Sequence, residues 1–132
     1  MHGFNQNIEQ ETIANTNFRK VLYTAKHTQL VLMCLQPSEE IGMEVHPDND
    51  QFFRFEAGQG KVIIDGNESM VQDGSAVIVP AGAKHNVINT SATEPLKLYT
   101  LYSPAHHKDQ IVRTTKAEAA ANEADFDGQT TE

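Results

Sequence analysis

Two short stretches of the chain hold the residues best suited to bind a metal ion. The first, "EVHPDNDQFFRFEAGQG" at 44–60, contains Glu44, His46 and Gln51, and the second, "DGSAVIVPAGAKHNVIN" at 73–89, contains His85. Two imidazoles, one carboxylate and one amide oxygen suit a divalent ion such as Zn, Mn, Fe, Ni or Co. Spacing alone leaves open a second interpretation, in which each histidine is an ordinary hydrogen-bonded residue of its strand.

Strand geometry tells which of these side chains share a face. Residues two apart in a strand point to the same side, so Glu44 and His46 form a pair. Gln51 follows the turn "PDND" and can begin the neighbouring strand, with Phe53 and Phe55 on its own face. A polar residue at the start of a strand whose face is otherwise aromatic indicates that this end of the strand lies at the opening of an apolar barrel interior. Phe52 then lies on the opposite face, where it is exposed unless a partner subunit covers it.

The elements that must position these residues are short strands. Seven segments rich in Val, Ile, Leu, Phe and Tyr lie between 18 and 103, each bounded by Gly, Pro, Asn or Asp, and Asp65-Gly66 marks a tight hairpin. None shows a sustained helical period. We predict an all-β fold, an antiparallel sandwich or barrel. It comprises an arm at 1–17, a barrel at 18–113, and an acidic tail at 114–132 that is partly helical or disordered.

Length, charge and cysteine content exclude several classes of protein. The chain has 132 residues, enough for one domain, and a formal net charge of -8 with no basic patch, which disfavours nucleic-acid binding. No apolar run approaches the roughly 20 residues of a membrane span. The N-terminus lacks the apolar core of a signal peptide. Cys34 is the only cysteine and lies among apolar residues, so we expect a buried thiol, no internal disulfide and a cytoplasmic location.

The second stretch resembles the second sequence motif of the cupin superfamily. That motif is a glycine, five residues, Pro-x-Gly, two residues, His, three residues and Asn, and here every position matches: Gly74, Pro80, Gly82, His85 and Asn89. The first stretch resembles the first cupin motif with altered residues. Gly58 fixes its register, so that Gln51 stands in the place of the usual glutamate, His46 in that of the second histidine, and Glu44 in that of the first. Ser38 occupies the place of the motif's opening glycine.

The resemblance covers roughly residues 18–103 and implies a conical β-barrel, or jelly roll, with a metal inside near one end. The usual three histidines and one glutamate carry one negative charge. Exchanging a histidine for Glu44 and the glutamate for Gln51 keeps that charge. The resulting set also resembles that of zinc phosphomannose isomerases, which favours zinc. The alternative is a barrel without metal, in which Gln51 hydrogen-bonds Glu44 and the interior is a binding cup.

The other polar residues have simpler interpretations. Asp48 and Asp50 are expected to serve the turn between two strands, and His27 to lie solvated in a hairpin turn. His106 and His107 follow the last clear strand. They are interpreted as part of a polar loop, the alternative being a lid or an accessory metal site.

Two functions from different classes fit these residues. The first is a metal-dependent enzyme acting on a small oxygenated substrate of the sugar or keto-acid type, by isomerisation or dioxygenation, with Glu44 as the catalytic base. The second is a non-catalytic module that binds a small molecule such as a sugar. In both cases we expect a homodimer, without a nucleic-acid or membrane partner.

Overall fold

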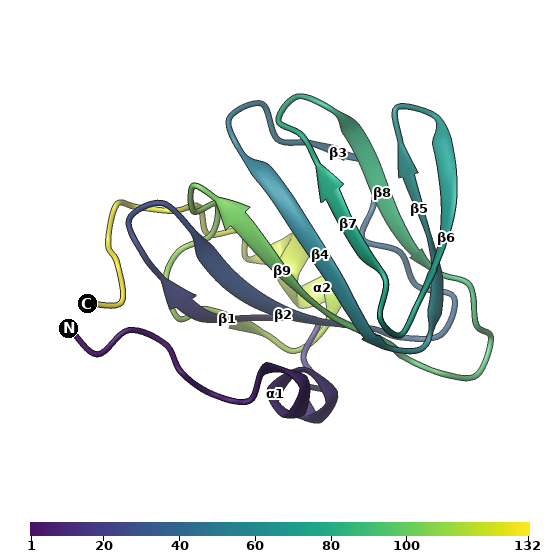
Figure 1. Cartoon of the computed structure of the whole chain (residues 1–132), viewed down its shortest axis with the longest axis horizontal. Coiled ribbons are helices and arrows are strands. Elements are labelled where there is room, and N and C mark those ends of the chain that lie inside the picture. The colour runs from purple at the N-terminus through teal and green to yellow at the C-terminus, as the bar shows by residue number, and fades with distance from the viewer.

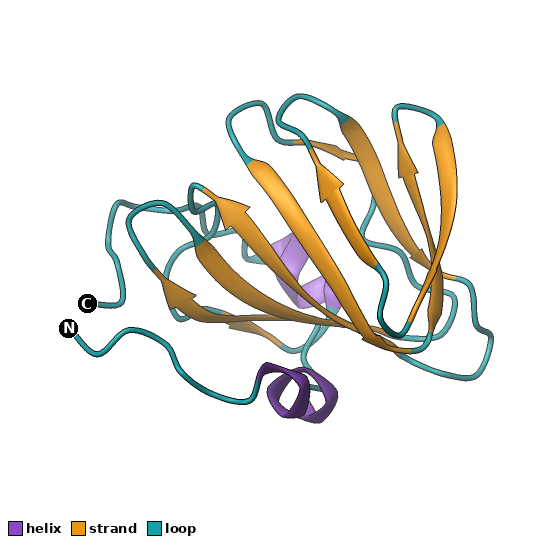
Figure 2. Ribbon diagram, viewed as in Figure 1, coloured by secondary structure: helices purple, strands orange, loops and turns teal.

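The computed structural model describes all residues from 1 to 132, and its strands form two antiparallel sheets that face each other (Figures 1 and 2). The six-stranded sheet has the order β10-β1-β2-β9-β4-β7, and the four-stranded sheet has the order β3-β8-β5-β6. The predicted cupin jelly roll is confirmed. The elements are α1 (Ile8–Ala14), β1 (Arg19–Thr24), β2 (Gln29–Leu35), β3 (Glu44–Val45), β4 (Asp50–Ala57), β5 (Gln59–Ile64), β6 (Asn67–Gln72), β7 (Ala76–Val79), β8 (Lys84–Asn89), β9 (Leu96–Ser103), β10 (Val112–Arg113) and α2 (Lys116–Ala121).

The core lies between the two sheets and follows from strand alternation. Phe53 and Phe55 of β4 are almost fully buried and stack with ring centroids 6.4 Å apart, as their shared face predicts. Cys34 is buried, also as predicted. The hairpin between β5 and β6 turns at Asp65 and Gly66, which both have positive φ (47° and 82°), the conformation that an Asp-Gly turn provides.

The N-terminal arm contains a helix that the sequence did not reveal. Asn7 caps α1 by accepting a hydrogen bond from the backbone of Gln10. The helix contacts β2, β4 and β9, so it lies against the outer face of the six-stranded sheet (Figure 1). The Lys97 ammonium on β9 donates to the Ile13 carbonyl, which fastens the helix to that face.

The C-terminal tail was expected to be partly helical or disordered, and the structure shows a helix followed by a segment bonded to the barrel. It contains the short helix α2, as "KAEAAANEA" predicts, and Ala119 of that helix belongs to the buried core cluster. The residues beyond α2 form backbone hydrogen bonds to the barrel: Phe126 donates to the His106 carbonyl, and Thr131 donates to the Thr24 carbonyl. These bonds satisfy polar backbone groups along the barrel rim. Amino-acid composition does not report backbone hydrogen bonds of this kind, so it could not predict that the tail is fastened. Neither α1 nor α2 is long and apolar enough to cross a membrane.

Candidate metal centre

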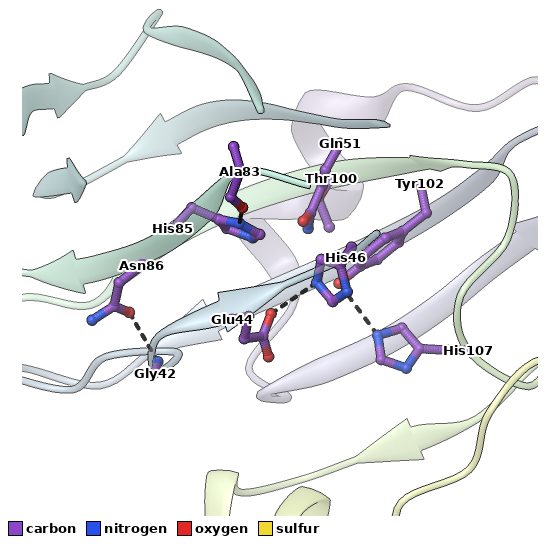
Figure 3. A network of polar contacts seen from close by, with 10 residues as sticks. All are labelled: Gly42, Glu44, His46, Gln51, Ala83, His85, Asn86, Thr100, Tyr102 and His107. Carbon is purple, nitrogen blue, oxygen red and sulfur yellow. Dashed lines mark hydrogen bonds and ion pairs between the residues drawn. The ribbon is translucent and has the colours of Figure 1, made fainter. Parts of the chain in front are cut away.

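Three strands, β3, β4 and β8, bring the four expected ligands into the mouth of the barrel. Glu44 on β3 lies directly opposite His85 on β8, because the two strands pair in that register. His46 follows β3 by one residue, and Gln51 enters from β4 on the facing sheet. Figure 3 shows Glu44, His46 and His85 gathered around a common space, with Gln51 beside it. All four residues of the predicted set therefore lie at one place.

The three ionisable members lie within the range of a shared ion. One ligand atom from each of Glu44, His46 and His85 falls within 4.8 Å of the others. A tetrahedral zinc ion with ligand distances of about 2.0–2.2 Å separates its donors by roughly 3–4 Å, so small side-chain rotations suffice to reach it. In the protein alone, His46 Nε2 and the Glu44 carboxylate lie 3.0 Å apart and hydrogen-bond each other.

His85 is held in the tautomer that metal binding requires. Its Nδ1–H donates to the Ala83 carbonyl at 3.0 Å, which leaves the lone pair on Nε2. That Nε2 atom is buried and has no hydrogen-bond partner. A buried polar atom without a partner costs about 1–3 kcal/mol, so such atoms are rare unless a ligand satisfies them.

Gln51 supplies the second buried polar atom of the site that has no hydrogen-bond partner. Its Nε2 donates to Thr100 Oγ1 at 3.0 Å, and this bond leaves the amide oxygen buried with no partner. No hydrogen bond joins Gln51 to Glu44, which is the contact that a metal-free cup would use. An amide oxygen and an imidazole nitrogen, both desolvated and both unpaired, fit the donor set of a borderline divalent ion.

The electrostatics of the site keep Glu44 charged and keep two histidines of the loop after β9 neutral. Burial raises the pKa of the Glu44 carboxyl, but the hydrogen bond and charge of His46, with smaller contributions from His85 and Arg19, outweigh it. The net result is a pKa below the usual value for glutamate. Burial lowers the pKa of His107 to about 2, and it lowers the pKa of His106 as well. Glu44 is thus the anionic member of the predicted ligand set.

His106 and His107 do not form the solvated polar loop that the sequence suggested. His107 is buried, and its Nε2 lies 3.3 Å from the Tyr102 hydroxyl, whose pKa is raised by burial. The His106 ring stands against that of His46, with centroids 4.3 Å apart. The buried side chain of Gln29 accepts hydrogen bonds from the backbone of both histidines. No local pattern signals this placement, because it depends on the path of the loop after β9.

Hydrogen bonds between loops hold the two motif stretches together. Asp50 Oδ1 accepts from the backbone of Ala81 at 2.9 Å, and the backbone of Gly82 donates to the His46 carbonyl at 2.9 Å. Asp50 therefore links the first motif to the turn of the second, while Asp48 stays exposed in its own turn. His27 is also exposed, as expected for its hairpin turn.

A cleft of about 330 Å³ opens beside Glu44 and His46, two of the four predicted ligands. Its walls combine strand ends of the barrel with the loop after β9 and the tail beyond α2. The lining residues are Arg19, Glu44, Val45, His46, His106, His107, Glu123, Ala124 and Asp125. Such a cleft is large enough to admit a small molecule to the space beside Glu44 and His46.

Fold and site together define a small β-barrel protein whose polar residues converge inside one end, and comparison with known proteins assigns the family. The family model described as a cupin domain matches residues 31–102, more than half of the chain. This protein belongs to the cupin family, as its motifs indicated.

Its relatives include proteins from a bacterium and a virus. The uncharacterized protein YrkC of Bacillus subtilis is 47% identical over 123 residues, which cover 89% of this chain and 66% of YrkC. The uncharacterized protein L612 of Acanthamoeba polyphaga mimivirus is 45% identical over 104 residues, covering 76% of this chain and 65% of L612. The chain thus spans about two thirds of the length of either relative. The crystal structure of BH2720 from Bacillus halodurans matches with a TM-score of 0.88 and 44% identity, covering 92% of this chain and 98% of that one.

Proposed function

We propose that this cupin binds one divalent metal ion through Glu44, His46, Gln51 and His85, and that it is an enzyme acting on a small oxygenated substrate. The observation that carries the proposal is the pair of buried, unpartnered atoms, His85 Nε2 and Gln51 Oε1, beside the Glu44 carboxylate. Zinc is favoured by the likeness of the ligand set to that of phosphomannose isomerases, and Mn, Fe, Ni or Co fit the same donors.

The bound ion would supply Lewis-acid chemistry, polarising a carbonyl or hydroxyl of the substrate, or dioxygen chemistry if it is iron. The protein's own residues have distinct roles around it. Glu44 supplies the negative charge, and it is the candidate base if its carboxylate, which borders the cleft, swings off the ion. Gln51 is a neutral, weaker ligand that a substrate oxygen can displace. The reactions that suit this arrangement are isomerisation of a sugar or keto acid and dioxygenation.

A non-catalytic binding module is the second candidate. It uses the same cleft, whose polar walls at Glu123 and Asp125 can accept hydrogen bonds from the hydroxyl groups of a sugar. The two candidates differ in what happens to a bound sugar. An enzyme converts it in a metal-dependent way, whereas a binding module releases it unchanged, which nuclear magnetic resonance of the recovered ligand distinguishes.

Metal analysis of protein purified without a metal-affinity tag tests the proposed site. We expect about one equivalent of divalent metal per chain in the native protein and a loss of most of it in the variant Glu44→Ala/His85→Ala. The reason is that two of the four ligands are removed, whereas neither of them belongs to the hydrophobic core cluster. An exposed-histidine variant, His27→Ala, serves as the control and should keep its metal. A native protein that takes up no metal under any loading condition would overturn the proposal.

We also expect a homodimer, supported by apolar residues on the outer face of the six-stranded sheet. Ile78 on β7 is 68% exposed and lies directly opposite the half-buried Phe52 on β4. Light scattering across a wide concentration range should give twice the chain mass. The substitution Ile78→Glu should shift the protein towards the monomer, because it places a charge in an apolar contact. A wild-type chain that scatters as a monomer throughout would contradict the expectation.

The remaining expectations about partners and location form part of the same proposal. The charge of -8 supports the absence of a nucleic-acid partner. Cys34 is a free thiol in the core, which supports a reducing compartment such as the cytoplasm. Equal labelling of Cys34 in denatured protein with and without a reductant would agree with this location.

A further inference from the structure

Arg19 is a cation of the cleft that has no partner within the protein. It is the first residue of β1 and lines the same cleft as Glu44 and His46. Its Nε atom is buried and has no hydrogen-bond partner, and its guanidinium group forms none of the ion pairs in the structure. The guanidinium carbon lies 5.5 Å from the centre of the Phe18 ring, which supports the side chain from one side. The Arg19 side chain is thus held in place by Phe18, while its guanidinium group has no hydrogen-bond or ion-pair partner.

The other lining residues make Arg19 the one permanent positive charge of this cleft. The lining includes no lysine and no second arginine, and its two histidines from the loop after β9, His106 and His107, are half-buried and buried. Arg19 is close enough to the site for its charge to act on Glu44, Tyr102 and both of these histidines. A guanidinium group with free donors matches the two oxygens of a carboxylate better than any other group in the cleft does.

The acidic residues of the cleft restrict the charge of what can bind. Glu123 and Asp125 on the tail are exposed at its rim, and the Glu44 carboxylate lies further in, beside His46. These three carboxylates repel a molecule that carries several negative charges. They also accept hydrogen bonds from hydroxyl groups. A molecule that suits the whole cleft has one carboxylate for Arg19 and hydroxyl groups along the rest of its length.

We propose that Arg19 binds the carboxylate of the substrate and that the substrate class is the small hydroxylated monocarboxylates, such as sugar acids. The carboxylate at Arg19 orients the molecule so that its hydroxyl or carbonyl oxygens face Glu44 and His46. This inference names the substrate class of the proposed metal centre and rests on it for the chemistry. The ion pair between Arg19 and a carboxylate does not depend on a bound metal, because it requires only the residues of the cleft.

Calorimetric titration with gluconate and with sorbitol tests this specificity. The two molecules have the same carbon chain length and differ mainly in the carboxylate. We expect gluconate to bind at least about tenfold more tightly than sorbitol, since only gluconate can form the charge-assisted pair with Arg19. The substitution Arg19→Gln should weaken gluconate at least about tenfold and leave sorbitol unchanged, and Arg19→Lys should recover part of the loss.

Arg113 offers a matched control. It lies directly opposite Arg19 on β10, but its guanidinium already donates to the carbonyls of Asn122 and Val112. Arg113→Gln should therefore leave the affinity for gluconate unchanged. Circular dichroism of each variant separates a change of binding from a change of fold, and Arg19→Lys keeps a test available if Arg19→Gln does not fold.

Repeating the titration with protein stripped of metal separates this inference from the proposed function. If the metal centre is wrong but the inference holds, gluconate still binds more tightly than sorbitol and still depends on Arg19. Equal affinities for gluconate and sorbitol, or an unchanged affinity in Arg19→Gln, would overturn the inference. Tighter binding of inorganic phosphate than of gluconate would also overturn it, because the acidic rim disfavours a dianion.

Discussion

The substitution Gln51→Glu is expected to destabilise the metal-free protein and to strengthen its binding of divalent metal. Gln51 is 2% exposed and lies beside an ionised Glu44, so the new carboxylate is both desolvated and close to a like charge. Such a group costs about 3 kcal/mol of stability at neutral pH. With an ion bound, the same charge becomes an anionic ligand. We expect metal affinity to rise at least about tenfold, which corresponds to ~1.4 kcal/mol.

The pH dependence of this variant follows from the direction of the expected pKa shift. Burial and the Glu44 charge raise the pKa of the new carboxyl in the folded state above its unfolded value of about 4.3. The folded state then holds its proton more tightly than the unfolded state does. The metal-free variant should therefore match the native protein below about pH 4 and lose stability as pH rises through the raised pKa. Chemical denaturation at several pH values measures this loss.

The control for Gln51→Glu is another buried glutamine outside the proposed ligand set. Gln29 is fully buried, and both ends of its amide are hydrogen-bonded: Nε2 donates to Thr24 and His107, and Oε1 accepts from the backbone of His106 and His107. Gln29→Glu should also destabilise the protein, but saturating metal should not restore it. If metal fails to restore Gln51→Glu, or restores both variants equally, Gln51 is not a ligand.

Strand alternation and turn chemistry predicted most of this barrel. Phe53 and Phe55 face the core because they share a face with Gln51, and Asp65-Gly66 forms the hairpin that its residue types indicate. These features are local, so a sequence displays them directly. The helix α1 was missed because it is only seven residues long and depends on its packing against the sheet for stability.

The candidate site could be predicted only where its residues belong to strands or motifs. Glu44, His46 and His85 converge because β3 and β8 pair, and the motif spacing anticipates that pairing. The positions of His106, His107 and Arg19 depend on how a loop and a strand end meet the barrel mouth. A periodic sequence pattern cannot predict such contacts, because they join segments that lie far apart in the chain. The tail was expected to be partly helical or disordered, and its helix was predicted from composition, whereas the backbone hydrogen bonds that fasten its end to the rim were not.

The glycine that fixed the register of the first motif is also expected to contribute strongly to stability. Gly58 has φ of +92°, which is strained for any residue with a side chain. A Cβ atom there would collide with the Pro95 carbonyl oxygen and lie 3.1 Å from Leu96 Cα, and both of these are backbone atoms. Gly58→Ala should cost about 1 kcal/mol for the backbone conformation and at least about 2 kcal/mol more for the collision.

Gly74 of the second motif separates these two contributions. Its φ is +91°, almost the same as that of Gly58, but a Cβ atom there meets nothing within 4 Å. Gly74→Ala should therefore lower the melting temperature by roughly 4 °C and Gly58→Ala by roughly 12 °C, at about 4 °C per kcal/mol for a chain of this size. Because Gly58 follows β4 directly, its collision with Pro95 would also shift the strand that carries Gln51. Equal losses in the two variants would mean that the Pro95 loop yields and that only the backbone conformation matters.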